Sequence, residues 1–166
     1  MELIKRGIVH VVVIDSIIVM ASLLLPLVSH ILPVPLYYLE PMRLLVLSSF
    51  LIYNDKRNAF ILAAVLPLVS FIVTGHPIIL KMMVMVFELT FNVAIFCYLI
   101  RKVNVFISVF LSIIISKLFY YGLKYLVIYY GFLSMELVTT PIYIQLITAV
   151  GVSVLFLLLF DKQRKI

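Results

Sequence analysis

The sequence predicts an all-α integral membrane protein with six transmembrane helices. Three observations lead to this fold class: 66% of the 166 residues are hydrophobic, only 12% are charged, and long apolar segments alternate with short charged ones. Such a composition is typical of membrane proteins and not of soluble domains. No internal repeat or low-complexity stretch divides the chain. We therefore expect one membrane domain over residues 1–166.

Six apolar segments are expected to form the helices. A membrane-spanning helix needs roughly 20 residues, with a range of roughly 17–25. The first, fourth, fifth and sixth segments meet this length, whereas the second and third are short and cross only if the turn Asn54–Asn58 lies at the membrane surface. The segments are Ile8–Leu32, Leu36–Tyr53, Ala59–Val73, Pro77–Ile100, Val105–Tyr130 and Pro141–Phe160.

The distribution of basic residues predicts the topology. They concentrate at the N-terminus, in every other connection and in the C-terminal tail, as the positive-inside rule requires for an even number of crossings. We expect a multi-pass protein of the cell membrane with both termini in the cytoplasm. The formal charge of +6 then needs no nucleic-acid partner. The residues concerned are Lys5, Arg6, Lys56, Arg57, Arg101, Lys102, Lys162, Arg164 and Lys165.

Several classes of function are not supported by the sequence. The single Cys97 excludes an internal disulfide and a cysteine-based metal cluster, and the three histidines lack the spacing of metal ligands. No Walker loop is present, so this chain does not hydrolyse ATP by that chemistry. No carboxylate dyad, serine–histidine pair or metal cluster indicates an active site. We expect neither enzyme activity nor a cofactor.

Two opposite charges lie near the middle of apolar segments. An ionisable group at the bilayer centre costs roughly 2.5–3.5 kcal/mol, so it normally faces a partner, a cavity or a ligand path. With a helical rise of about 1.5 Å per residue, Glu88 lies roughly 16 Å and Lys117 roughly 20 Å from the outer helix ends. The two residues are therefore predicted at similar depth. Either they form an interhelical ion pair, or they form the floor of a binding cavity, or both.

Three further cations, Arg43, Lys81 and Lys124, belong to the outer half of the membrane. Positive charge there runs against the positive-inside rule. Within the membrane we expect only Glu88 to oppose these cations and Lys117. Because unpaired positive charge in a low dielectric is costly, a carboxylated micronutrient is a more suitable ligand than a cationic one such as thiamine.

Helical spacing places other polar side chains beside these charges. Residues seven apart share one helix face. A half-exposed pocket lined by amines, tyrosines and methionines suits a small anion with an apolar or aromatic body. The two faces comprise Lys117, Tyr120, Tyr121 and Lys124 on the fifth segment, and Lys81, Met85, Glu88 and Asn92 on the fourth.

The turn before the fourth segment adds a second feature suited to anions. In Gly75-His76-Pro77, proline is expected at the first helical position, so the N-terminal amides of the helix point outward. His76 either contacts the ligand directly or is a solvated loop residue, and we include it among the candidate site residues. The predicted substrate-binding residues are thus Arg43, His76, Lys81, Glu88, Asn92, Lys117, Tyr120, Tyr121 and Lys124.

Four segments, in their order and spacing, resemble those of one family. They are Glu40-Pro41-Met42-Arg43, the stretch from Leu66-Pro67-Leu68-Val69-Ser70 through Thr74-Gly75-His76-Pro77 to Glu88-Leu89, Ser116-Lys117-Leu118-Phe119-Tyr120-Tyr121-Gly122, and Pro141 leading into Gln145-Leu146. Together they resemble the substrate-binding S components of energy-coupling-factor (ECF) vitamin transporters. The resemblance covers most of the chain from Pro26 to Phe160.

The resemblance implies a protein that captures a vitamin-like molecule from the extracytoplasmic side. Its partners would be a transmembrane T subunit and two cytoplasmic ABC ATPases, and substrate would bind at the outer ends of helices two, four and five. Many members dock the T subunit through an Ala-x-x-x-Ala patch on helix one, which is missing here. Asp15, Ser22 and Ser29 recur instead at seven-residue spacing. Asp15 and Ser22 are therefore the predicted docking residues.

Two alternatives from other classes remain open. A cell-shape scaffold of the MreD type has similar length and hydropathy, and it predicts that Lys81, Lys117 and Lys124 pair structurally without an extracytoplasmic pocket. A proton-coupled secondary transporter would use Asp15 and Glu88 as relay carboxylates. Its uptake would follow a proton gradient without ATPases.

Overall fold

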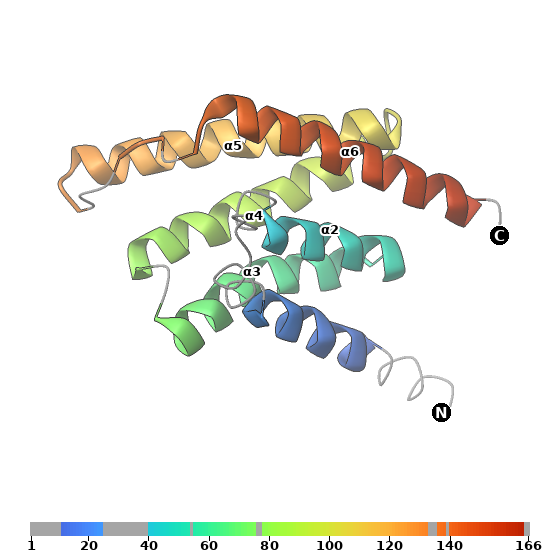
Figure 1. Cartoon of the computed structure of the whole chain (residues 1–166), viewed down its shortest axis with the longest axis horizontal. Helices are drawn as coiled ribbons and strands as arrows, with labels where there is room; N and C mark the ends of the chain where they lie inside the picture. The colour runs from blue at the N-terminus through green and yellow to red at the C-terminus, as the bar shows by residue number, and fades with distance from the viewer. Residues whose placement is uncertain are drawn as a thin grey trace.

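The chain is a bundle of α-helices in the computed structural model, which describes residues 11–24, 40–53, 55–75, 78–132, 136–138 and 140–164 (Figure 1). No strand occurs among these residues, so the predicted all-α class is confirmed. Helix α4 packs against both α3 and α5, while α2 packs on α3 and α6 on α5. The helices are a first helix described over Val11–Leu24, α2 (Pro41–Tyr53), α3 (Lys56–Thr74), α4 (Ile79–Leu99), α5 (Val105–Tyr129) and α6 (Ile142–Arg164).

Within the described residues, four helices are long and apolar enough to cross a membrane: α3, α4, α5 and the Ile142–Phe160 part of α6. Helix α3 is longer than the sequence suggested. The predicted turn over Asn54–Asn58 extended too far toward the C-terminus, because the Asp55 carboxylate accepts a hydrogen bond of 2.9 Å from the backbone N–H of Arg57. This N-cap starts the helix at Lys56 and places Asn58 inside it.

Two helices begin later than predicted. Helix α2 begins at Pro41 and not at Leu36, because Glu40 is non-helical and proline suits the first helical position. Helix α4 begins at Ile79 after the non-helical Ile78, and the predicted start at Pro77 lies outside the described residues. Helix α3 ends at Gly75, whose backbone lies in the left-handed region at φ 68°. The Gly75 N–H donates to the carbonyl of Phe71.

A row of serines lies on one face of α5. Ser108, Ser112 and Ser116 are fully buried, and each hydroxyl donates to a carbonyl of its own helix. Small side chains let neighbouring helices approach closely, which is how helices associate in lipid. Asn92 of α4 donates to the Ser116 hydroxyl at 3.2 Å, so this face of α5 meets α4.

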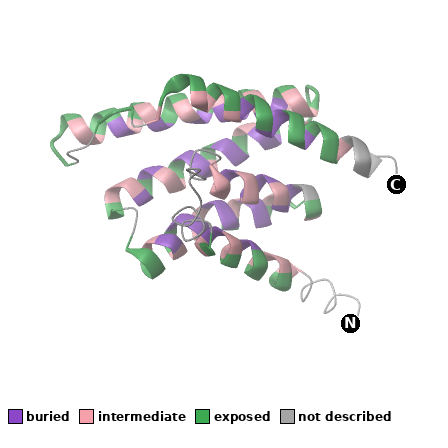
Figure 2. Cartoon of the chain, viewed as in Figure 1, coloured by how far each residue is buried: buried purple, intermediate pink, exposed green. Residues whose placement is uncertain are grey.

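The outer surface of the bundle is apolar. Large hydrophobic side chains are exposed on every helix, and only 17% of the α6 span is buried. Figure 2 shows the buried residues between the helices and the exposed ones on the outer sides. The first helix begins and α6 ends on the same side of the molecule, at the right in Figure 1. The apolar outer surface of the bundle is suited to contact with lipid, as expected of a membrane protein.

Candidate functional site

Four charged side chains meet in one group, here called the ion cluster: Glu40, which directly precedes α2, Arg43 of α2, Glu88 of α4 and Lys117 of α5. Arg43 forms salt bridges with both Glu40 and Glu88. Lys117 pairs with Glu40, and its Nζ lies 3.5 Å from Oε1 of Glu88. The Arg43 side chain is only 3% exposed. The cluster therefore joins three helices through buried and half-buried charge.

The predicted match in depth between Glu88 and Lys117 is confirmed by this ion pair. The expectation that only Glu88 opposes the cations was wrong, because Glu40 supplies a second carboxylate. With two cations and two carboxylates, the ion cluster is formally neutral. Arg43 is buried within it.

Glu40 has an unusual backbone conformation. Its φ of 49° lies in the left-handed region, which residues other than glycine rarely adopt, and it precedes a proline. Such strain costs on the order of 1–3 kcal/mol and persists only where other contacts hold it. Two kinds of contact do so here. The Glu40 carbonyl accepts hydrogen bonds from the N–H groups of Arg43 and Leu44, at 3.0 and 3.2 Å, and its carboxylate pairs with Arg43 and Lys117.

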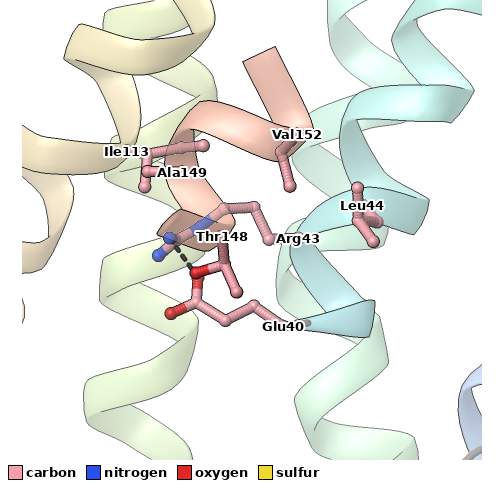
Figure 3. Close-up of a pocket in the computed structure, with 7 residues that line it drawn as sticks. All are labelled: Glu40, Arg43, Leu44, Ile113, Thr148, Ala149 and Val152. Atoms are coloured by element: carbon pink, nitrogen blue, oxygen red, sulfur yellow. Dashed lines mark hydrogen bonds and ion pairs between the residues drawn. The ribbon is translucent and has the colours of Figure 1, made fainter. Parts of the chain in front are cut away.

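A small cavity adjoins the ion cluster between α2, α5 and α6. Figure 3 shows Arg43 and Glu40 beside Thr148 and the apolar side chains that complete the wall. There is room for about one water molecule. The Nε of Arg43 is buried and has no hydrogen-bond partner within the part of the chain that the structure describes. This space is too small for a vitamin in the conformation described.

The lysines and tyrosine of α5 share one face, as the seven-residue spacing predicted. The ring of Tyr120 lies 5.6 Å from Nζ of Lys117 and 6.0 Å from Nζ of Lys124. Lys124 is buried and donates to the carbonyl of Leu137 at 2.9 Å. Its ammonium therefore ties α5 to the α5–α6 connection. This contact could not be predicted from residue types, because the acceptor is a backbone group.

The remaining predicted site residues are spread over the same region. Asn92 is buried against Ser116, and the Tyr121 hydroxyl accepts a hydrogen bond from Gln145 of α6. Lys81 is half-buried in α4 and has no ion-pair partner among the described residues. His76 lies outside the described residues.

The predicted docking residues face the inside of the bundle. Asn58 of α3 donates to the Asp15 carboxylate at 3.0 Å, and Ser22 is buried. The exposed side of the first helix is apolar and includes Val13, Ile17, Met20 and Leu24. Docking through Asp15 and Ser22 stays a prediction. The structure shows that Asp15 also has a local role, which is to hold the first helix against α3.

Sequence reasoning missed Glu40 and Gln145 as polar contacts of the site. The signal for Glu40 was its spacing, since residues three apart at a helix start can pair across one turn. For Gln145 it was an amide in an apolar segment, which needs a partner in lipid.

Among the described residues, no group of histidine, cysteine, aspartate or glutamate side chains could hold a metal ion. No family model, curated protein or solved structure matches this chain.

Proposed function

We propose that this chain is the substrate-capture (S) component of an ECF-type importer in the cell membrane. It crosses the membrane six times with both termini in the cytoplasm, and it binds a small anionic vitamin or similar micronutrient from outside. One observation carries the proposal. Helices α2, α4 and α5, to which the family resemblance assigns binding, bring Arg43, Glu88 and Lys117 together.

The chemistry of the cluster supports an anionic substrate. Arg43 presents a planar guanidinium that matches a carboxylate, and Lys117 adds an ammonium that is 20% exposed. Lys81 adds a further cation that has no ion-pair partner among the described residues. A cationic substrate would be repelled by Lys81, and it would gain no attraction from Arg43 and Lys117, whose charges Glu40 and Glu88 balance in the absence of ligand. After capture, a T subunit and two cytoplasmic ATPases would supply the energy for release inside the cell.

A membrane scaffold of the MreD type is the second candidate, and specific contacts favour it. Lys117 and Lys124 have structural partners, as that alternative predicted, and the cavity beside the cluster holds only about one water molecule. Lys81 departs from the scaffold prediction, because it has no ion-pair partner among the described residues. A scaffold would need no ligand, so a search for one separates the two candidates.

The test is to purify the chain alone in detergent and identify bound small molecules by native mass spectrometry. We expect a small anionic ligand. Lys81→Ala should weaken its binding by about 1–3 kcal/mol, the scale of a lost charged hydrogen bond. Lys102→Ala is the matched control, because Lys102 is exposed in the α4–α5 connection and should leave affinity unchanged. Absence of ligand from every growth medium, or equal affinity for the acid and amide forms, would contradict the proposal.

A further inference from the structure

Glu40 differs from the other members of the ion cluster in how it is held. Arg43, Glu88 and Lys117 belong to helices, whereas Glu40 lies just before α2 with φ at 49°. Its side chain is 23% exposed, while the Arg43 that it covers is 3% exposed. Glu40 is therefore the member whose carboxylate can leave most easily, because it is the more exposed carboxylate of the cluster and its departure moves no helix.

The charges left behind would form an anion site. Without Glu40, Arg43 and Lys117 face only Glu88, so the group carries one net positive charge. A buried charge without a partner is costly, and one monovalent anion would neutralise it. The wall of the adjoining cavity supplies a further donor, because Nε of the buried Arg43 has no partner among the described residues.

We propose that the Glu40 carboxylate is an internal occupant of an anion site made by Arg43 and Lys117, and that a ligand monocarboxylate binds by displacing it. The identity of the natural ligand in this inference rests on the proposed function, whereas the existence of the anion site does not. Exchange of one carboxylate for another keeps the cluster neutral. It also explains why the cavity beside Glu40 is small, because Glu40 fills the space that the ligand's carboxylate would take.

The internal carboxylate makes binding selective. A ligand must compete with Glu40, so its apparent affinity is reduced by the fraction of molecules in which the site is open. An uncharged analogue cannot replace Glu40 without leaving Arg43 and Lys117 short of negative charge. Removal of the Glu40 carboxylate should therefore increase the affinity for any small monocarboxylate that reaches the site.

The experiment uses benzoate as the probe and benzylammonium as its counterpart of opposite charge, both at fixed ionic strength. Glu40→Gln keeps the side-chain shape and removes the charge, whereas Glu40→Gly also relieves the strain at φ 49°. Thermal unfolding of the detergent-solubilised protein is followed through the reactivity of the buried Cys97 thiol. Glu136→Gln, which removes an exposed carboxylate outside the cluster, is the matched control.

We expect benzoate to raise the melting temperature of both Glu40 variants at a concentration at least tenfold lower than in the natural protein or in Glu136→Gln. Benzylammonium should have no such effect, and Lys117→Met in the Glu40→Gly background should abolish the response to benzoate. Equal benzoate responses in all proteins would overturn the proposal. The proposal would also be overturned if neither Glu40 variant yields folded protein even with benzoate in the purification buffer. Benzoate should then take the place of the missing Glu40 carboxylate.

The two proposals fail in different ways. If the natural protein carries no ligand but the Glu40 variants gain benzoate binding, the anion site stands and the transport function does not. If an anionic ligand is purified with the natural protein but removal of the Glu40 carboxylate changes no affinity, the transport function stands. Glu40 would then be only a structural partner of Arg43.

Discussion

Replacing Arg43 with methionine is expected to lower the free energy of unfolding by about 3–5 kcal/mol, the cost of removing one partner from a buried ion pair. The Arg43 guanidinium donates hydrogen bonds to both carboxylates of the ion cluster, those of Glu40 and Glu88. Without it, Glu40 and Glu88 share Lys117 alone and one buried negative charge is left over. Methionine is flexible and keeps an apolar stem like that of arginine, so the main change is the loss of the charged guanidinium.

The control is the double variant Arg43→Met with Glu88→Gln. It leaves Glu40 and Lys117 as a neutral pair, so it should recover part of the stability lost in Arg43→Met. Lys117→Met should cost less than Arg43→Met, because Arg43 still binds both carboxylates. Thermal or denaturant unfolding followed at Cys97 measures all three. A loss below about 1 kcal/mol for Arg43→Met, or additive effects in the double variant, would contradict this role.

Replacing Phe96 with alanine should also cost about 3–5 kcal/mol. Phe96 is fully buried in the core, where its ring meets Phe50 of α2 edge-on with centroids 5.2 Å apart. Apolar side chains gain little by leaving lipid, so the loss comes from the contacts that an unfilled space removes. The cavity would lie between α2 and α4, where few other contacts join these helices.

Phe87→Ala provides the matched control, since it makes the same chemical change on the same helix. Phe87 is 59% exposed, so its loss removes surface contact with lipid and leaves no internal cavity. We expect its effect to stay within about 0.5 kcal/mol. Unfolding of both variants at equal detergent concentration gives the comparison. Similar losses for the two variants would show that Phe96 is not packed in the core as described.

The sequence determined the helical class, the bounds of α5 to within one residue, and the equal depth of Glu88 and Lys117. These features depend on local apolar length and on the rise per residue, both of which can be counted along the chain. The start of α3 was also within reach, because Asp55 is a favourable N-cap residue three positions before Asn58.

Only the tertiary structure decided the partners of these charges. Arg43 and Glu88 are 45 residues apart, and their contact depends on how α2 and α4 are rotated and how closely they approach. The same holds for Lys124, whose acceptor is a backbone carbonyl, and for Glu40, whose left-handed backbone is held by side chains of two helices. Sequence spacing fixes which residues share a helix face, but the packing of one helix on another selects the charges that meet.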